Sequence, residues 1–520
     1  MNTIVDIKIL PSELNLEEVI LQKARKQAKL GISHVQGYRI LKRSIDARQR
    51  QAVYRLRIEL FDKEVPKNPP PGFTPALQKK ALQVIIVGAG PAGYFAALRC
   101  IENGLQPIII DRGKDVQSRR RDLKAIQQDG IVNPDSNYCF GEGGAGTYSD
   151  GKLYTRSHKR GRISDILQIL VDHGAKTDIL IDAHPHIGSN KLPKIIAQIR
   201  ESILNHGGQI LFESKVVDFI TKDDSIKGVR FIVNDEEKEM VADAVILATG
   251  HSARDIFQLC HQHHLAMNSK PFALGIRIEH PQRLIDEIQY NQPEREENLP
   301  ASSYSVACQV KGAGVFSFCM CPGGLIVPAA TSPEEIVVNG MSLSKRDSPF
   351  ANSGIVAEVS TEYLEQKGYT GLFAGVEFQQ KVESDFYKFG DGTQKAPAQK
   401  LTDFIEGNVT STAMESSYIP GLVSAPVHEL LPIDITQKIR KASFEFDRKL
   451  KGFLTDEAHV IGVESRTSSP IKIHRNKETY MSPSLSALFP CGEGAGYAGG
   501  ILSAAIDGRN VADAVAQFLE

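Results

Sequence analysis

Residues 84–93 decide the fold of most of the chain, and they read Val84-Ile85-Ile86-Val87-Gly88-Ala89-Gly90-Pro91-Ala92-Gly93. The apolar residues suit a buried strand, and the glycines have the spacing G-x-G-x-x-G at the start of a helix. The first glycine permits a tight turn, the second lets a pyrophosphate approach the backbone, and the third lets the helix pack on the strand. The helix N-terminus offers free N–H donors to phosphate. The segment therefore predicts a Rossmann-like unit that binds a dinucleotide.

Asp111 follows the next predicted strand, at residues 107–110, and stands 23 positions after Gly88. A carboxylate at this place accepts hydrogen bonds from ribose hydroxyls and disfavours a 2′-phosphate. The site is therefore not expected to hold NADP. Residues 141–146 match the same glycine spacing, but no apolar strand precedes them. We interpret them as a loop rich in N–H donors that can line a cofactor, and not as a second fingerprint.

Two further segments favour a flavin dinucleotide. Ala244-Val245-Ile246-Leu247-Ala248-Thr249-Gly250 is a buried strand that ends in a turn. Phe489-Pro490-Cys491-Gly492-Glu493-Gly494-Ala495-Gly496-Tyr497-Ala498-Gly499-Gly500 leads into an apolar helix at residues 501–519. There Glu493 is placed to bind ribityl hydroxyls, and the helix dipole is placed to stabilise negative charge on a reduced flavin. We therefore expect FAD as the cofactor. The residues predicted to bind it are Gly88, Gly90, Pro91, Ala92, Gly93, Asp111, Arg112, Gly143, Gly144, Val216, Thr249, Gly250, Gly492, Glu493, Gly499, Gly500 and Ile501.

Motifs along nearly the whole chain resemble those of a bacterial family of FAD-dependent dehydrogenases, also labelled NAD-utilising dehydrogenases. They are Lys42-Arg43-Ser44-Ile45-Asp46-Ala47-Arg48, the run from Phe140 to Leu153, Ala248-Thr249-Gly250-His251-Ser252-Ala253-Arg254-Asp255, Lys270-Pro271-Phe272-Ala273-Leu274-Gly275, Cys319-Met320-Cys321-Pro322-Gly323-Gly324, Glu464-Ser465-Arg466-Thr467-Ser468-Ser469-Pro470, and the C-terminal glycine-rich turn. The resemblance implies FAD binding and the fold, but no particular substrate. Asp111 departs from it, since many FAD relatives carry glutamate there, although either acid can hold ribose.

We predict an α/β protein of three parts. Residues 1–65 form a small α+β module, in which residues 53–60 alternate between apolar and polar and so leave one sheet face exposed. A Pro-rich linker covers 66–80. Residues 81–270 and 466–520 form a discontinuous Rossmann-like FAD domain of the glutathione-reductase type, and residues 271–465 form an inserted, mixed α+β substrate domain.

Composition sets the class of protein. The chain has 520 residues, a formal net charge of −1 and a mean hydropathy of −0.21, which suit a globular multidomain protein. The longest nearly uncharged apolar run, residues 84–98, is shorter than the roughly 18–20 residues that span a bilayer. The first residues lack a secretory-signal pattern, and seven cysteines do not form a disulfide framework. We therefore expect a cytoplasmic protein with no membrane segment.

Glu464 and Arg466 are the candidate catalytic pair, because they precede the C-terminal flavin segment by a short distance. Arg466 would stabilise an anionic substrate or the reduced flavin, and Glu464 would orient it or act as an acid or base. An ordinary ion pair between domains is the alternative. Cys319 and Cys321 form a C-x-C motif, which suits a flavin-coupled dithiol, but we expect buried reduced thiols. No metal site is predicted, since the sequence has no second ligand pair at a spacing that suits zinc.

These features together predict an FAD-dependent oxidoreductase that transfers a hydride through flavin N5 to or from a small molecule. Only one true dinucleotide fingerprint is present, so NAD(P)H would bind transiently. The alternative from another class is a flavin-dependent RNA-modifying protein, because residues 1–80 hold 16 lysines and arginines against eight carboxylates. Against that alternative, the module lacks the aromatic-rich sheet of an RNA-recognition motif, and we expect no nucleic-acid partner. A non-catalytic FAD-bound scaffold is a third possibility. The sequence leaves the oligomeric state undetermined.

Overall fold

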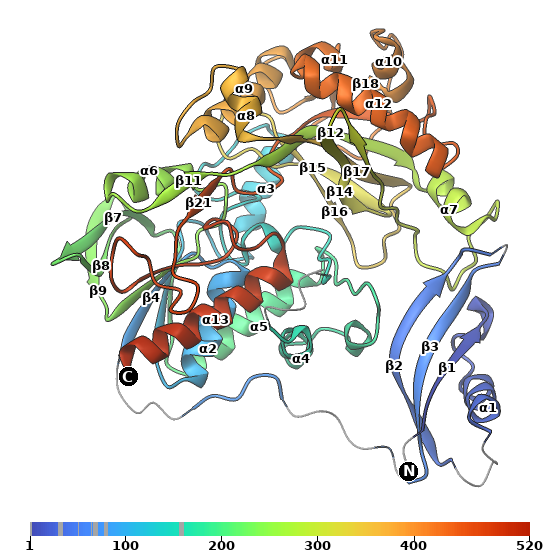
Figure 1. Cartoon of the computed structure of the whole chain (residues 1–520), viewed down its shortest axis with the longest axis horizontal. Coiled ribbons are helices and arrows are strands. Elements are labelled where there is room, and N and C mark those ends of the chain that lie inside the picture. Colours follow the sequence, from blue (N-terminus) through green and yellow to red (C-terminus); the bar gives the residue numbers. More distant parts are fainter. Residues whose placement is uncertain are drawn as a thin grey trace.

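The structure is a computed structural model that describes residues 3–29, 35–49, 51–63, 65, 71–76, 82–154 and 161–520. A small N-terminal sheet, a parallel sheet and a larger, mainly antiparallel sheet follow one another along the chain (Figure 1). Of the predicted linker at 66–80, residues 66–70 and 77–80 lie outside the described residues, and 71–76 form neither helix nor strand. No helix within the described ranges is long and apolar enough to cross a bilayer.

The N-terminal module is a three-stranded antiparallel sheet of order β1-β3-β2 with a helix on one face. Its elements are β1 (Thr3–Ile9), η1 (Pro11–Glu13), α1 (Glu17–Ala28), β2 (Gly37–Asp46) and β3 (Val53–Phe61). The apolar residues of β3 are buried against α1, and Arg55 and Arg57 between them are exposed, as the alternation predicts. Tyr54 is in the buried set and its hydroxyl donates to Asn298 O at 2.6 Å, so this aromatic ring is not available on the exposed face.

The module also contacts the rest of the chain through β2. Arg43 Nε donates to Asp182 Oδ1 at 2.6 Å, and the Arg43 N–H donates to Ile181 O at 2.7 Å. Tyr54, through its bond to Asn298, holds a second point of contact on the loop after helix α7 (Gln282–Tyr290). The module therefore contacts a loop near the parallel sheet, at Ile181 and Asp182, and a loop of the region that contains the large sheet, at Asn298.

The parallel sheet has the order β22-β10-β4-β5-β6. Its strands are β4 (Gln83–Val87), β5 (Gln106–Ile110), β6 (Gln209–Leu211), β10 (Ala244–Leu247) and β22 (Leu488–Pro490). The central strands are apolar on both faces because both faces are covered, as is usual in parallel sheets. Ile86 and Ile246 point toward a layer of helices on one face of the sheet, whereas Ile85 and Val245 point toward the elements on the opposite face.

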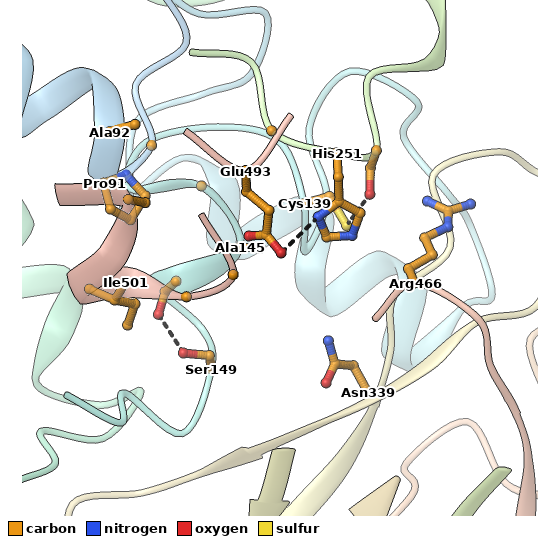
Figure 2. Close-up of a pocket in the computed structure, with 18 of the residues that line it drawn as sticks. Pro91, Ala92, Cys139, Ala145, Ser149, His251, Asn339, Arg466, Glu493 and Ile501 are labelled. Atoms are coloured by element: carbon orange, nitrogen blue, oxygen red, sulfur yellow. Dashed lines mark hydrogen bonds and ion pairs between the residues drawn. The ribbon is translucent and has the colours of Figure 1, made fainter. Parts of the chain in front are cut away.

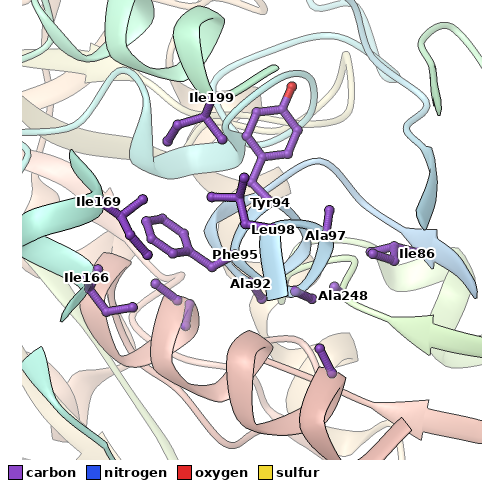
Figure 3. Close-up of a cluster of buried hydrophobic side chains, with 14 of the residues drawn as sticks. Ile86, Ala92, Tyr94, Phe95, Ala97, Leu98, Ile166, Ile169, Ile199 and Ala248 are labelled. Atoms are coloured by element: carbon purple, nitrogen blue, oxygen red, sulfur yellow. The ribbon is translucent and has the colours of Figure 1, made fainter. Parts of the chain in front are cut away.

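The layer of helices packs on the sheet through the larger of the two apolar cores. Its helices are α2 (Pro91–Glu102), α4 (Ile163–Asp172), α5 (Leu192–Asn205) and α13 (Ile501–Leu519). Figure 3 shows Phe95 and Leu98 of α2 among Ile166, Ile169 and Ile199 of the neighbouring helices. On the opposite face lie the antiparallel strands β7 (Lys215–Lys222), β8 (Ser225–Val233) and β9 (Glu236–Val241), with helix α6 (Arg254–Gln262). Helix α3 (Arg119–Gln128) and the short 3-10 turns η3 (Gly144–Gly146) and η4 (Thr177–Leu180) lie in the connections.

A seven-stranded sheet of order β13-β14-β17-β12-β20-β18-β19 is built from residues 272–464. Its strands are β12 (Phe272–Pro281), β13 (Ala307–Val310), β14 (Ala313–Cys321), β17 (Phe350–Val359), β18 (Ala396–Lys400), β19 (Leu422–Ser424) and β20 (His459–Glu464). A strand pair, β15 (Gly324–Pro328) and β16 (Val338–Ser342), lies beside it. Helices α8 (Thr361–Gln366), α9 (Ala374–Phe389), α10 (Leu401–Glu406), α11 (Val427–Leu430) and α12 (Ile433–Lys449) cover this region (Figure 1).

The chain passes from the parallel sheet to the large sheet through β11 (Met267–Ser269) and returns through β21 (Ile471–Ile473), and these two strands pair antiparallel. The strands of the two sheets thus fall on either side of residues 270 and 465. We propose that the FAD domain comprises residues 81–270 and 466–520 and that residues 271–465 are the inserted domain.

Candidate functional site

The glycine-rich turn joins β4 to α2 at the carboxyl edge of the parallel sheet. Gly88 has φ of +110°, which L side chains rarely adopt. A Cβ at Gly93 would lie 1.9 Å from Gly88 O, so the third glycine is needed where the helix packs on the turn. Gly90 is the N-cap of α2, and a Cβ there would meet no atom nearer than Gly144 Cα at 4.0 Å. The second glycine therefore faces open space and leaves the helix N-terminus accessible.

Asp111 lies next to this turn and is 8% exposed. Its Oδ2 accepts from Ala89 N–H at 2.7 Å and its Oδ1 accepts from Gly113 N–H at 2.8 Å. The carboxylate thus joins the turn to the loop after β5. Each oxygen retains a lone pair that can accept a hydroxyl hydrogen bond.

The glycine-rich turn borders a pocket of about 360 Å³, which we call the larger pocket. Figure 2 shows Pro91, Ala92 and Ile501 at one side of it, and Asn339 and Arg466 at the other. Among the residues predicted to bind the cofactor, those that line it are Gly88, Gly90, Pro91, Ala92, Asp111, Gly144, Thr249, Gly250, Glu493, Gly499, Gly500 and Ile501. The second glycine spacing, at 141–146, contributes Gly144 and Gly146 to the wall.

A smaller pocket shares Gly88, Asp111 and Thr249 with the larger one. Val216 and Arg112, the two remaining predicted residues that reach a pocket, line this second space. The guanidinium of Arg112 lies over the Phe140 ring and pairs with Asp255 Oδ2 at 2.5 Å. Two pockets that meet at Asp111 suit an elongated ligand better than a compact one.

The C-terminal glycine-rich turn lines the larger pocket beside the first one, since Figure 2 shows Ile501 on the same side as Pro91. A Cβ at Gly499 or Gly500 would meet nothing within 4 Å, and Gly500 is the N-cap of α13. Glu493 Oε1 lies 3.3 Å from His251 Nδ1, and Figure 2 shows the two side chains facing each other. Two helix N-termini, bare glycines and a carboxylate are groups that fit a pyrophosphate with two sugar-like chains.

Four predicted residues do not line either pocket. Gly93 supports the turn from below, and Gly143 donates its N–H to Ala89 O at 2.8 Å. Gly492 donates its N–H to Asp507 Oδ2 at 2.8 Å. Glu464 is 2% exposed and binds Arg277 Nη1 at 2.6 Å. The three glycines shape the turns around the pockets, while Glu464 lies in the large sheet.

Arg466 lines the larger pocket, but its donors are engaged. Its Nη2 lies 2.8 Å from Glu335 Oε2 and 2.9 Å from Glu383 Oε2, and its Nη1 donates to Thr331 Oγ1 at 2.6 Å. Arg254 binds the same two glutamates, at 2.6 and 2.7 Å. The four charges form a closed, neutral cluster behind the pocket wall. The catalytic roles of Glu464 and Arg466 stay predictions, and these contacts favour the interdomain ion pair for Arg466.

Several pocket residues were not among the predicted site residues, notably Cys139, Lys152, Phe318, Cys319 and Asn339. Lys152 and Cys319 stand in motifs that the family resemblance had marked, so a signal existed for them. Asn339 lies on β16, more than 200 residues from the glycine-rich turn, and carries no local signal.

Comparisons with known proteins agree on the cofactor. A family model described as an FAD binding domain matches residues 83–120 and 154–284, and one described as "FAD-dependent protein, C-terminal domain-like" matches 271–467. A domain of unknown function matches residues 1–61. An uncharacterised protein of Clostridium beijerinckii is 37% identical over 524 residues, which cover 97% of this chain and 96% of that protein.

Solved structures are similar at a much lower level. A flavin-dependent brominase has 12% identity and a TM-score of 0.37, with 85% of this chain and 80% of that chain covered. A glycerol-3-phosphate dehydrogenase from Bacillus halodurans, complexed with FAD, has 13% identity and a TM-score of 0.38, with 85% and 66% covered. These scores carry no conclusion about the substrate. By the family models and the full-length relative, the chain belongs to one family with the Clostridium beijerinckii protein and is an FAD-dependent oxidoreductase.

Proposed function

We propose that the two adjoining pockets hold one FAD molecule, with the adenosine half in the smaller pocket and the flavin half in the larger one. The observation that carries this proposal is the convergence of two helix N-termini, at Gly90 and Gly500, on pockets that meet at the Asp111 carboxylate. Val216 offers an apolar wall for a base, and Asp111 offers acceptors for ribose hydroxyls. This assignment makes the parallel sheet and its helices a domain of the glutathione-reductase type.

FAD, when bound, supplies hydride transfer through flavin N5. The chain's own contribution around the larger pocket is a set of groups from different segments: Lys152, Asn339, Cys319 and the peptide N–H groups at the start of α13. Burial opposes it, but negative charge in the Cys319–Cys321 segment and on Asp150 raises the pKa of Lys152, so this side chain stays a cation. A fixed cation and a helix N-terminus stabilise negative charge that develops beside them. The reaction proposed is therefore oxidation or reduction of a small molecule that enters between Lys152 and Asn339.

The electron partner is a separate part of the proposal. Only one pair of pockets is assigned to a dinucleotide, so NAD(P)H would enter the substrate end transiently and leave after transfer.

The test begins with the FAD content of the purified protein, which should reach one FAD per chain after incubation with the cofactor. Anaerobic stopped-flow reduction is then followed by the flavin absorbance, with NADH and NADPH in turn and dithionite as the control. Rapid bleaching by one nicotinamide would identify the reductant. Bleaching by dithionite alone would exclude the transient nicotinamide and direct the search to substrates that reduce the flavin themselves. A protein that takes up no FAD would refute the whole proposal.

A further inference from the structure

Cys319 and Cys321 lie at the end of β14, where the large sheet reaches the larger pocket. Cys319 lines that pocket and is half-buried, whereas Cys321 is fully buried. The strand is bulged here, because the three steps from Phe318 to Cys321 face two steps from Gly354 to Asn352 on β17. Cys319 has φ of +46°, in the left-handed region that residues with a Cβ rarely occupy. Bulges turn side chains out of the regular alternation of a strand, and this one accompanies a cysteine at the pocket wall.

The two cysteines share contacts. Cys321 Sγ donates to Cys319 O at 3.3 Å, so the buried side chain folds back toward its neighbour. Arg277 Nη2 donates to the same carbonyl at 2.6 Å and lies 3.7 Å from Cys321 Sγ. Lys152 Nζ donates to Met320 O, between the two cysteines. Residues two apart in an extended chain have Cα atoms about 7 Å apart, and a disulfide needs about 4.4–6.8 Å, so the bulged segment is within reach of one.

The charges around the pair favour a thiolate. Lys152 and Arg277 contact the C-x-C segment directly. Glu464 is bound to Arg277 at 2.6 Å, and Asp150 is bound to Arg346 at 2.8 Å and lies 3.4 Å from Lys152. Even with both carboxylates ionised, three cations face two carboxylates, so this group holds an excess of positive charge that one thiolate offsets.

The pKa values of the two thiols also favour a single thiolate, because one is lowered and the other is raised. A hydrogen bond with the Cys321 thiol, and then the charges of Lys152 and Arg277, lower the pKa of Cys319 despite its burial. The hydrogen bond with Cys319, together with burial, raises the pKa of Cys321. Glu279, further along β12, is the other nearby carboxyl, and burial raises its pKa. One sulfur is therefore anionic and the other holds a proton, which is the state in which a dithiol is oxidised most readily.

We propose that Cys319 and Cys321 form a dithiol–disulfide couple that exchanges two electrons with the flavin; this rests on the proposed function, since it requires FAD in the larger pocket. As the S–S bond forms, the Cys319 thiolate and the Cys321 thiol together lose two electrons and one proton. Both electrons and the proton pass to oxidised FAD, so the step balances without another reagent. In the reverse direction, reduced FAD returns them and the S–S bond breaks.

Of the five other cysteines, Cys139 also lines the larger pocket, where its Sγ donates to Ala329 O at 3.8 Å and accepts from Ser252 Oγ at 3.5 Å. The remaining four do not line it. Cys100, Cys260 and Cys491 are fully buried, and burial raises their thiol pKa values. Cys308 is half-buried on β13, and burial raises its pKa as well. Cys308→Ser is therefore a matched control for a change of one thiol outside the pocket.

The experiment is an anaerobic dithionite titration of the FAD-loaded enzyme after mild oxidation, with electrons counted per FAD. Wild type and C308S should take up about twice as many electrons per FAD as C319S and C321S, because the couple and the flavin each accept two. Wild-type enzyme should also show two fewer free thiols after oxidation than after reduction. Peptide mapping should place the lost thiols at residues 319 and 321, and this readout needs no variant to fold.

Equal electron uptake by wild type and the variants, or a wild type in which Cys319 and Cys321 remain free thiols after oxidation, would overturn the couple. Either result with a full complement of FAD would leave the proposed function standing. Failure of the wild type to bind FAD would instead remove the proposed function, and the couple with it.

Discussion

Replacing Gly90 by alanine should separate cofactor binding from folding. Gly90 has φ of −75° and ψ of −176°, which any L residue adopts. The new Cβ would meet only Gly144 Cα, at 4.0 Å. The substitution should therefore leave the stability of the FAD-free protein unchanged, or raise it by about 0.4–1 kcal/mol through a less flexible unfolded chain. The methyl group instead fills the space at the start of α2 that we assign to the pyrophosphate.

The size of the binding defect follows from what the methyl group displaces. A hydrogen bond to a charged group contributes about 1.5–3 kcal/mol, and 1.4 kcal/mol is tenfold in affinity. Loss of one backbone-to-phosphate bond should weaken FAD binding by about ten- to hundredfold. Gly93→Ala is the contrasting variant, because its Cβ would lie 1.9 Å from Gly88 O, a backbone atom that cannot rotate away. That overlap should destabilise the FAD-free protein by about 1–3 kcal/mol.

Both quantities are measurable on the same preparations. Urea unfolding of FAD-free protein, followed by circular dichroism, gives the transition midpoint, and quenching of flavin fluorescence gives the dissociation constant. G90A with wild-type affinity for FAD would refute the placement of the pyrophosphate over Gly90. G90A with a midpoint as low as that of G93A would show that the absence of a Cβ at Gly90 serves folding and not the ligand.

Three further results are expected. Burial raises the pKa of Glu464 to about 7, so the folded protein holds a proton that the unfolded chain releases. The free energy of unfolding should therefore fall as pH rises from 4.5 to 7. A series of melting temperatures should show this fall in wild type and a flatter profile in E464Q. R43A removes the ion pair between β2 and Asp182, so limited proteolysis should release the N-terminal module faster than in wild type. R48A is the control, because the Arg48 side chain is 80% exposed and pairs with the neighbouring Asp46, and it should behave as wild type. Equal release from the two variants would show that Arg43 does not hold the module. In reduced enzyme at mildly acidic pH, iodoacetamide should label Cys319 before Cys308, because the pKa of Cys319 is lowered and that of Cys308 is raised. Mass spectrometry of the labelled peptides gives the order of labelling. Labelling of Cys308 first would contradict the lowered pKa of Cys319.

The turn and helix at which we propose the dinucleotide to bind were predictable because their signals are local. Gly88, Gly90 and Gly93 act on a turn and a helix that their own neighbours form, and Asp111 ends the very next strand. The glycines follow one buried parallel strand and Asp111 follows the next, so the edge of the sheet brings them together without contacts from distant segments. Prediction of helix 501–519 also agreed with α13, since an apolar run after two glycines determines where it begins.

The other half of the site depends on packing between distant segments. Glu464 and Arg466 were predicted as a catalytic pair because they precede the C-terminal glycine-rich segment by a short distance. β20 ends at Glu464, whose side chain binds Arg277 on the neighbouring strand β12, while Arg466 beyond the strand end binds Glu383 of α9. Sequence spacing alone does not reveal partners that are 83 and 187 residues away. Asn339 was missed for the same reason.

The buried charge cluster of Arg254, Arg466, Glu335 and Glu383 links the two halves. Arg254 begins α6 on the parallel sheet, whereas Glu383 belongs to α9 on the large sheet. Replacement of such a cluster by apolar side chains is often neutral or stabilising, so its contribution is better understood as orientation than as stability. An apolar contact would tolerate sliding, whereas sliding would break the ion pairs of 2.6–2.9 Å in this cluster, so we infer that it orients the two sheets. The turns that we propose to bind FAD lie on one sheet and Cys319 lies on the other, so under that proposal the alignment of the sheets sets the position of Cys319 relative to the flavin.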